Sequence, residues 1–309
     1  MAWIEQEPLA PRRIGSTGLV VNPIGLDGSV FGWVAGHEDT AAVLDGFHEA
    51  GGTLISTADH YAGGRSEIMI GHWVRERGLR ESVVLATKVG RHPDADRYDR
   101  RTLTRAVEAS LERLDTDHID LLSLDGERPG TDLDELVITL EVLIASGKVG
   151  TVGAAGFPAP GVSALVDGGA PVSAVISEYS LMVRGGYENG LDAFAVERGT
   201  AGVARLPLAN GYLTGDFRSK GTVPADGMFA EAAKHVGRTG NRVLDALGQI
   251  AGETGSTRAG VAIAWTLTRP GIAATVVRAR SLAQLPPLLA ASVVHLTPQH
   301  LALLDKLSR

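Results

Sequence analysis

Two residues in the N-terminal third of the chain have side chains suited to proton-transfer chemistry. Tyr61 follows the apolar run 53–57, and Lys88 directly follows the apolar run 83–87. A lysine at the apolar end of a strand is costly unless it is paired or functional. Close to a phenol, its charge would lower the pKa of the tyrosine, which suits proton transfer to or from a carbonyl or hydroxyl group. The alternative is a lysine that extends to solvent and a tyrosine packed beneath a loop.

Short apolar runs alternate with amphipathic helical patterns along the chain, and they predict the framework that positions this pair. The predicted strands are 23–26, 53–57, 83–87, 119–124, 149–154, 174–177, 203–206 and 274–277. Their near-continuous apolar character is typical of parallel strands covered on both faces. The pattern predicts an α/β protein with one domain over residues 1–309, a single (β/α)8 TIM barrel. Residues 13–22 are expected to form a β-hairpin that caps the barrel bottom, and residues 214–227 a loop over its mouth.

The functional site of such a barrel is built from the loops after the C-terminal ends of its strands. Asp27 and Trp33 follow the first predicted strand, and Ser56 ends the second. We expect these three residues to face the substrate, with Trp33 as an apolar wall. Other strand ends carry Asp125, His60, Glu127, Glu178 and Arg205, so a pocket at this end would be strongly polar.

Several long segments resemble the aldo-keto reductase superfamily over nearly the whole chain. They read GGTLISTADHYAGGRSEIMIG, VVLATKVG, SLERLDTDHIDLL, GKVGTVGAAGF, EYSLMVR and PLANGYLTGDF. The resemblance implies the (β/α)8 barrel and an NADP(H)-dependent ancestor. It also implies that Tyr61 is the proton-donating tyrosine and Lys88 the lysine that tunes it.

Two catalytic positions of the family are changed. The aspartate that pairs with the lysine falls at Ser56, and the histidine that orients the substrate carbonyl falls at Asp125. We expect Asp125 to be the counterion of Lys88 and a second acid/base group, because two titratable groups in different environments are typical of assigned acid and base roles. The alternative is drift in an inactive homologue.

The resemblance also divides the cofactor site into an altered half and a retained half. At the nicotinamide end, Ala155-Gly156, Ile176 and Arg205 replace a Ser-Asn pair, a glutamine and a ring-stacking aromatic. Losing those donors forfeits roughly 0.5–1.5 kcal/mol per hydrogen bond. At the nucleotide end, Pro287-Leu288 replaces Glu-Asn, but the residues expected to bind NADP(H) or another phosphorylated ligand remain: Arg278, Arg280, Gln284, and Leu208 and Gly211 of PLANGYL.

Composition excludes several other classes of protein. The formal net charge of -7 leaves no basic footprint for nucleic acid, and the absence of cysteine excludes disulfides, thiolate nucleophiles and cysteine-ligated metals. No histidine or carboxylate cluster has metal-ligand spacing. The absence of cysteine also makes a cytoplasmic location the expected default. Neither a membrane-spanning run nor an N-terminal signal peptide is expected. The oligomeric state is not predicted.

Three functional hypotheses remain. In the first, an aldo-keto-reductase-like enzyme has lost hydride transfer and performs redox-neutral acid/base chemistry on an oxygenated small molecule: dehydration, epimerisation or cyclisation. In the second, the chain is an NADP(H)-dependent carbonyl or aldehyde oxidoreductase with an unusual site. In the third, it is a catalytically silent binding protein. The retained Tyr61 and Lys88 argue against the third hypothesis.

Overall fold

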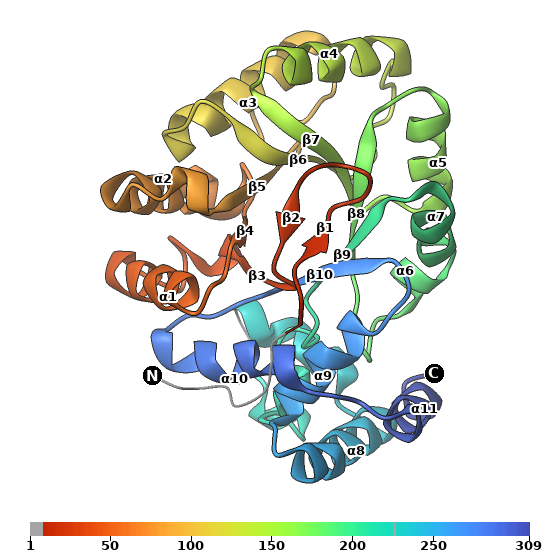
Figure 1. The fold of residues 1–309 in the computed structure, drawn as a ribbon. Helices are drawn as coiled ribbons and strands as arrows, with labels where there is room; N and C mark the ends of the chain where they lie inside the picture. The colour runs from red at the N-terminus through yellow and green to blue at the C-terminus, as the bar shows by residue number, and fades with distance from the viewer. Residues whose placement is uncertain (1–8, 225–226) are drawn as a thin grey trace.

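The computed structural model describes residues 9–224 and 227–309, in which eight parallel strands close into a barrel surrounded by helices (Figure 1). Neighbouring strands follow chain order, and the last strand pairs with the first. The strands are β3 (Ile24–Asp27), β4 (Leu54–Ser56), β5 (Val84–Val89), β6 (Ile119–Asp125), β7 (Val149–Ala155), β8 (Val172–Glu178), β9 (Ala201–Arg205) and β10 (Ile272–Val277). The predicted (β/α)8 barrel is confirmed, and each predicted strand overlaps an observed one.

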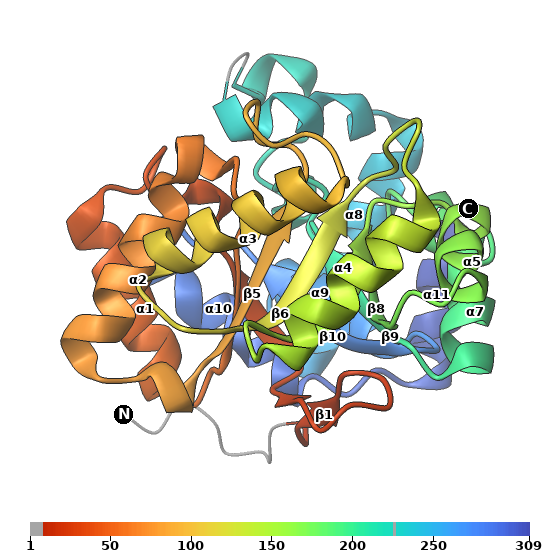
Figure 2. The same ribbon diagram turned by 90° about the horizontal axis from the view of Figure 1, so that it is seen from above.

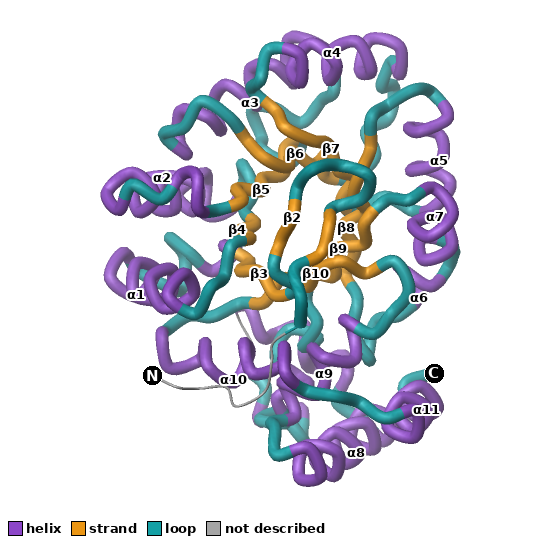
Figure 3. Tube along the Cα trace, in the orientation of Figure 1, coloured by secondary structure: helices purple, strands orange, loops and turns teal. Residues whose placement is uncertain are grey.

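The helices form a ring outside the strands, which the tube view separates by colour (Figure 3). Their bounds are α1 (His37–Glu49), α2 (Arg65–Arg77), α3 (Arg100–Leu114), α4 (Leu133–Ala145), α5 (Ala159–Asp167), α6 (Gly185–Glu188), α7 (Leu191–Arg198), α8 (Arg238–Thr254), α9 (Arg258–Leu267), α10 (Leu285–Leu289) and α11 (Pro298–Leu307). Each strand–helix unit turns the chain back so that the next strand starts at the same end of the barrel. The C-terminal strand ends therefore gather at one mouth.

Helix α3 shows how the sequence specifies these outer elements. The Asp99 side chain accepts a hydrogen bond from the backbone N–H of Thr102 at 3.0 Å, which caps the first turn. Leu103, Val107 and Leu114 recur at helical spacing and are buried against the barrel. The predicted apolar face is therefore the packed face.

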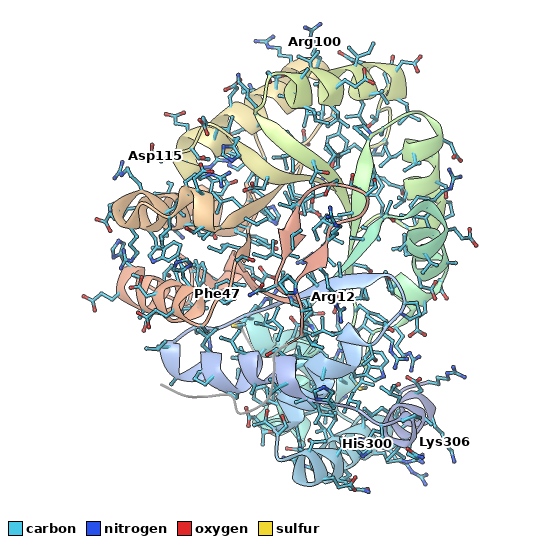
Figure 4. All side chains as sticks on the ribbon, viewed as in Figure 1. Arg12, Phe47, Arg100, Asp115, His300 and Lys306 are labelled. Carbon is cyan, nitrogen blue, oxygen red and sulfur yellow. The ribbon has the colours of Figure 1, made fainter. Side chains whose placement is uncertain are left out.

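The predicted N-terminal hairpin is confirmed and consists of β1 (Arg12–Arg13) paired antiparallel with β2 (Val20–Val21). Figure 2 shows this hairpin at one end of the barrel and the segment that follows β9 at the other. Arg12, labelled near the barrel axis in Figure 4, donates from Nη1 to the carbonyl oxygens of Leu267 at 3.1 Å and Ile272 at 2.8 Å. These bonds hold the hairpin across the barrel bottom.

The barrel interior changes character from bottom to mouth. At the bottom, Ile14 and Val21 of the hairpin region join inward-facing strand residues such as Leu54, Val84 and Leu121 in an apolar cluster. Towards the C-terminal ends of the strands, the buried inward-facing residues become polar or charged: Asp27, Ser56, Lys88, Ser123 and Asp125. Buried charges are costly unless they are paired, so this layer is where function is expected.

The segment predicted as a loop over the mouth is partly helical. The 3-10 helix η4 (Tyr212–Thr214) ends at the first residue of this segment, η5 (Lys220–Thr222) lies within it, and η6 (Gly227–His235) begins at its last residue. The Phe217 and Phe229 rings lie 5.4 Å apart and hold this region together. Residues 225–226 of the predicted loop and residues 1–8, where no signal peptide is expected, lie outside the described residues. In the described part, no helix combines the length and apolar character needed to cross a bilayer.

Candidate active site

The structure brings Tyr61 and Lys88 together at the barrel mouth. Tyr61 opens the 3-10 helix η2 (Tyr61–Gly64), and Lys88 lies near the end of β5. The Lys88 ammonium lies 4.7 Å from the centroid of the Tyr61 ring. Both side chains are buried, so the alternative of a lysine that extends to solvent is not observed.

The electrostatics of Tyr61 differ from the sequence-based expectation. Burial raises the pKa of Tyr61 above its ordinary value and the negative charge of Asp27 raises it further, while Arg205 and Arg278 act in the opposite direction. The expected lowered pKa of Tyr61 is therefore not found, because burial outweighs the neighbouring cations. The Lys88 ammonium faces the ring, and the phenolic oxygen instead accepts a hydrogen bond from Arg205 Nη2 at 3.3 Å. The phenol is thus a proton donor at neutral pH.

Lys88 is a buried amine with an unusually low proton affinity. Its Nζ donates to Ser56 Oγ at 3.3 Å and to the carbonyl oxygen of Thr57. Burial and the neighbouring Arg205 lower the pKa of Lys88 to about 8, although Asp27 partly offsets them. A lysine that titrates near neutrality can exchange protons with a substrate.

Asp125 is not the counterion of Lys88. Its Oδ1 lies 2.9 Å from Nε of Arg91, whose side chain is 52% exposed. Asp125 meets Arg91 because it ends β6, beside the segment after β5 that carries Arg91. Asp125 acts on the pKa of Lys88 only after Asp27. The role of Asp125 as a second acid/base group stays a prediction.

Asp27 occupies the place next to the family's missing aspartate. It is the register partner of Ser56 on the neighbouring strand, so both side chains point to the same face of the sheet. Asp27 is only 1% exposed, and its Oδ1 accepts a hydrogen bond from the backbone N–H of Ser29 at 2.9 Å. Its Oδ2 lies 3.7 Å from Nε of Arg278. Asp27 therefore lies within a buried charge cluster, and its contact with substrate stays a prediction.

Trp33, the expected apolar wall, lies between η1 (Gly28–Val30) and α1 and is 55% exposed. Its contact with a substrate stays a prediction, as does that of Ser56, which is buried against Lys88. His60 pairs with Asp59, its Nδ1 lying 3.2 Å from Oδ1.

We call the largely buried group formed by Asp27, Tyr61, Lys88, Asp125 and Arg205 the charged centre. A cavity of about 610 Å³ opens beside it, between the segment after β9 and the segment after β10. All five residues predicted to bind the cofactor line it: Leu208, Gly211, Arg278, Arg280 and Gln284. The Arg280 backbone N–H donates to Gln284 Oε1 at 2.9 Å, and its guanidinium lies 4.7 Å from the Phe229 ring centroid. Sequence reasoning missed Phe229 and Met228, because the segment that carries them has no recognisable motif.

Comparison with known proteins identifies the ancestry of this site. The model of the Aldo/keto reductase family matches residues 27–309. The chain belongs to this family. It is 29% identical over 316 residues to aldo-keto reductase str7 of Strobilurus tenacellus, covering 97% of this chain and 92% of that protein.

Other relatives share the same framework. This chain is 28% identical over 293 residues to a probable aryl-alcohol dehydrogenase, AAD4, of Saccharomyces cerevisiae, and the match covers 87% of this chain and 88% of that protein. A crystal structure of the thermostable aldo-keto reductase Tm1743 superposes with a TM-score of 0.79 at 23% identity, over 97% of this chain and 100% of that one. The latter likeness establishes the fold alone.

The two halves of this aldo/keto reductase site fit NADP(H) differently. At the nucleotide end, Arg278 and Arg280 line the cavity, and the buried Arg278 Nε has no hydrogen-bond partner within the described residues. A phosphate fits such a donor. At the ring end, Ala155, Gly156 and Ile176 carry no side-chain hydrogen-bonding group, and the Arg205 guanidinium is bonded to Tyr61. The nucleotide half fits the residues present, and the nicotinamide half does not.

Proposed function

We propose that this aldo/keto reductase family member is an enzyme that performs redox-neutral acid/base chemistry on an oxygenated small molecule. The observation that carries the proposal is the hydrogen bond from Arg205 to Tyr61. The resemblance assigns the Arg205 position to an aromatic that stacks on the nicotinamide ring. A cation there opposes an oxidised nicotinamide ring, which is itself positively charged, and it stabilises negative charge developing on a bound substrate.

The charged centre supplies the groups that dehydration or epimerisation requires. Tyr61, whose pKa is raised by burial, is protonated at neutral pH and can donate its proton to a leaving hydroxyl or a carbonyl oxygen. Asp125 can accept the proton lost from the neighbouring carbon, and so can Lys88 in those molecules in which it is a neutral amine, a minority at neutral pH because its pKa is about 8. One proton enters the substrate and one leaves it, so no external oxidant or reductant is needed.

An NADP(H)-dependent carbonyl oxidoreductase is the second candidate, and one observation favours it. The five predicted cofactor-binding residues line one cavity of about 610 Å³. Relatives carry the names of reductases and dehydrogenases, which also supports this candidate. In either case we propose a small molecule as the partner, and the cytoplasmic location stays a prediction from composition.

The deciding experiment measures proton exchange and hydride transfer on the same panel of hydroxy-carbonyl compounds. In D₂O, the proposed enzyme should exchange the hydrogen next to the carbonyl for deuterium, or eliminate water, as followed by proton NMR. No oxidation of NADPH, measured as a fall in absorbance at 340 nm, should accompany the exchange or the elimination. The second candidate would instead be established if a carbonyl compound of the panel oxidised NADPH and no deuterium exchange occurred when NADPH was left out. Tyr61→Phe serves as the control that ties either signal to this site.

A further inference from the structure

Asp27 belongs to the charged centre and lies next to Arg278, which lines the nucleotide cavity. Its Oδ2 is buried and makes no hydrogen bond within the described residues. The nearest cation on the cavity side is Arg278, whose Nε lies 3.7 Å from this oxygen. This Nε also has no hydrogen-bond partner among the described residues. The separation is that of an ion pair without a hydrogen bond.

Cations on the other side compete for the same carboxylate. Ser56, the register partner of Asp27, accepts a hydrogen bond from Lys88, and Arg205 has a buried Nε without a partner in the described residues. Burial opposes ionisation of Asp27, but Arg278, Arg205 and Lys88 outweigh it and hold its pKa below the usual value. The carboxylate is therefore ionised and has one buried oxygen without a hydrogen bond. Within the described residues Arg278 is the cation that lies within 4.0 Å of it, whereas Lys88 and Arg205 act on it electrostatically from farther away.

Arg278 is also exposed to the cavity in which a phosphate would bind. A phosphate carries more negative charge than a carboxylate and accepts several hydrogen bonds, so it competes with Asp27 for this guanidinium. We propose that Asp27 is a shared positioning carboxylate. It neutralises Arg278 when the cavity holds no anion, and it turns to Lys88 and Arg205 when a phosphorylated ligand takes Arg278.

Such sharing links the two sites thermodynamically. If a phosphate on Arg278 strengthens the pairing of Asp27 with Lys88, protonation of Lys88 must strengthen phosphate binding by the same factor. The inference does not rest on the proposed reaction, because both consequences are equilibrium properties of the protein. It also gives a role to a carboxylate that lies one strand away from the position of the family's aspartate.

The first test measures the affinity of the full chain for 2′,5′-ADP by titration calorimetry. Asp27→Asn removes the competing charge and should bind this probe about 5- to 10-fold more tightly, the lower part of the usual range of coupling between sites. Asp59→Asn is the matched control, because Asp59 is equally buried at this end of the barrel but bonds to His60 and to the Gly90 N–H. Its affinity should stay within about twofold of wild type.

The second test reads Lys88 directly. The chain has five lysines, so the ε-carbon signal of Lys88 in lysine-labelled protein can be assigned with Lys88→Met and followed against pH. Saturation with 2′,5′-ADP should raise the pKa of Lys88, and the shift should disappear in Asp27→Asn. The other charges that act on Lys88, Arg205, Asp125 and Glu67, are unchanged in this comparison.

The outcomes separate clearly. Tighter binding by Asp27→Asn but not by Asp59→Asn, together with a ligand-dependent shift of Lys88 that requires Asp27, supports the proposal. Absence of 2′,5′-ADP binding to wild type overturns it, as does an equal shift of Lys88 in wild type and Asp27→Asn. If Asp27→Asn does not fold, Arg278→Met replaces it: this variant should raise the pKa of Lys88 in the ligand-free protein, and an unchanged pKa overturns the proposal.

Discussion

The nucleotide cavity and the charged centre lie side by side at the barrel mouth but differ in construction. The cavity is open, has walls such as Leu208, Phe229 and Leu288, and presents two arginines. The centre is closed around buried ionisable groups, among them Lys88 at 2% exposure and Asp27 at 1%. One region is built to receive an anion from solvent, and the other holds its charges against one another.

The two halves of an inherited site can therefore diverge separately. The cavity keeps the residues that the family resemblance assigns to the nucleotide, whereas the centre keeps Tyr61 and Lys88 and changes what surrounds them. A nucleotide is recognised by phosphate charge and shape, which do not depend on the reaction. Catalysis depends on the placement of individual charges, so it changes when a few residues change.

The strongest test of the charged centre is removal of its acid and base. Tyr61→Phe and Lys88→Met should each lower turnover of an identified substrate at least about 100-fold, because general acid/base groups contribute on that scale. Binding of 2′,5′-ADP to the cavity should persist in both variants. Tyr187→Phe, at a buried tyrosine that bonds to the Pro270 carbonyl, is the control. Normal turnover in Tyr61→Phe would show that chemistry does not take place in this centre.

The centre should also cost stability, because Lys88 is buried as an ammonium at neutral pH. Folding lowers its pKa from 10.5 to about 8. The unfolded chain binds more protons between these values, so the free energy of unfolding should rise with pH from about 8 towards 10.5. Above pH 10 Tyr61 opposes this trend, because burial raises its pKa and only the unfolded chain then loses the proton.

Lys88→Met should therefore stabilise the protein at pH 7, by on the order of 3 kcal/mol, and flatten the rise between pH 8 and 10. Urea denaturation at pH 7 and pH 9.5 measures both effects. Lys148→Met is the comparison, because Lys148 is partly exposed and pairs with Glu108 at the surface. If Lys88→Met were no more stable than wild type at pH 7, the interactions of the Lys88 ammonium would fully offset the free-energy cost of burying it.

The cavity should respond to loss of a cation in affinity rather than in stability. Arg280→Met should weaken 2′,5′-ADP binding by about 10- to 100-fold, as expected for loss of a hydrogen bond to a charged group. Its melting temperature should change little, since Arg280 lies on a loop and packs on Phe229. Calorimetry and a melting curve measure the two quantities. Unchanged affinity would place the nucleotide elsewhere.

The smallest expected effect lies where the two regions meet. In wild type, NADP⁺ should bind no more tightly than 2′,5′-ADP, because the nicotinamide half finds Arg205 and no side-chain donor at Ala155 or Ile176. Arg205→Phe restores an apolar aromatic surface, worth about fivefold in favour of NADP⁺ if stacking contributes about 1 kcal/mol. A wild-type preference for NADP⁺ would show that the ring is accommodated despite Arg205.

Part of this molecule could be predicted from its sequence. The alternation of apolar runs with helical patterns predicted the eight strands, and strand-end position predicted that Tyr61 and Lys88 meet. The residues that the resemblance assigns to the cofactor, Leu208, Gly211, Arg278, Arg280 and Gln284, line one cavity, and their role in binding stays a prediction. These inferences succeed because backbone periodicity and barrel closure fix where each Cα must lie.

Only the tertiary structure decided which charges pair. The sequence expected Asp125 beside Lys88, but the register of β3 against β4 puts Asp27 next to Ser56, and Asp125 meets Arg91. The sequence also predicted a phenol with a lowered pKa. Burial at the barrel mouth instead raises the pKa of Tyr61, and Arg205 donates a hydrogen bond to its phenolic oxygen. Several cations and carboxylates share one strand-end layer, and their pairing depends on side-chain reach and desolvation. Sequence position determines that they meet, and packing determines how.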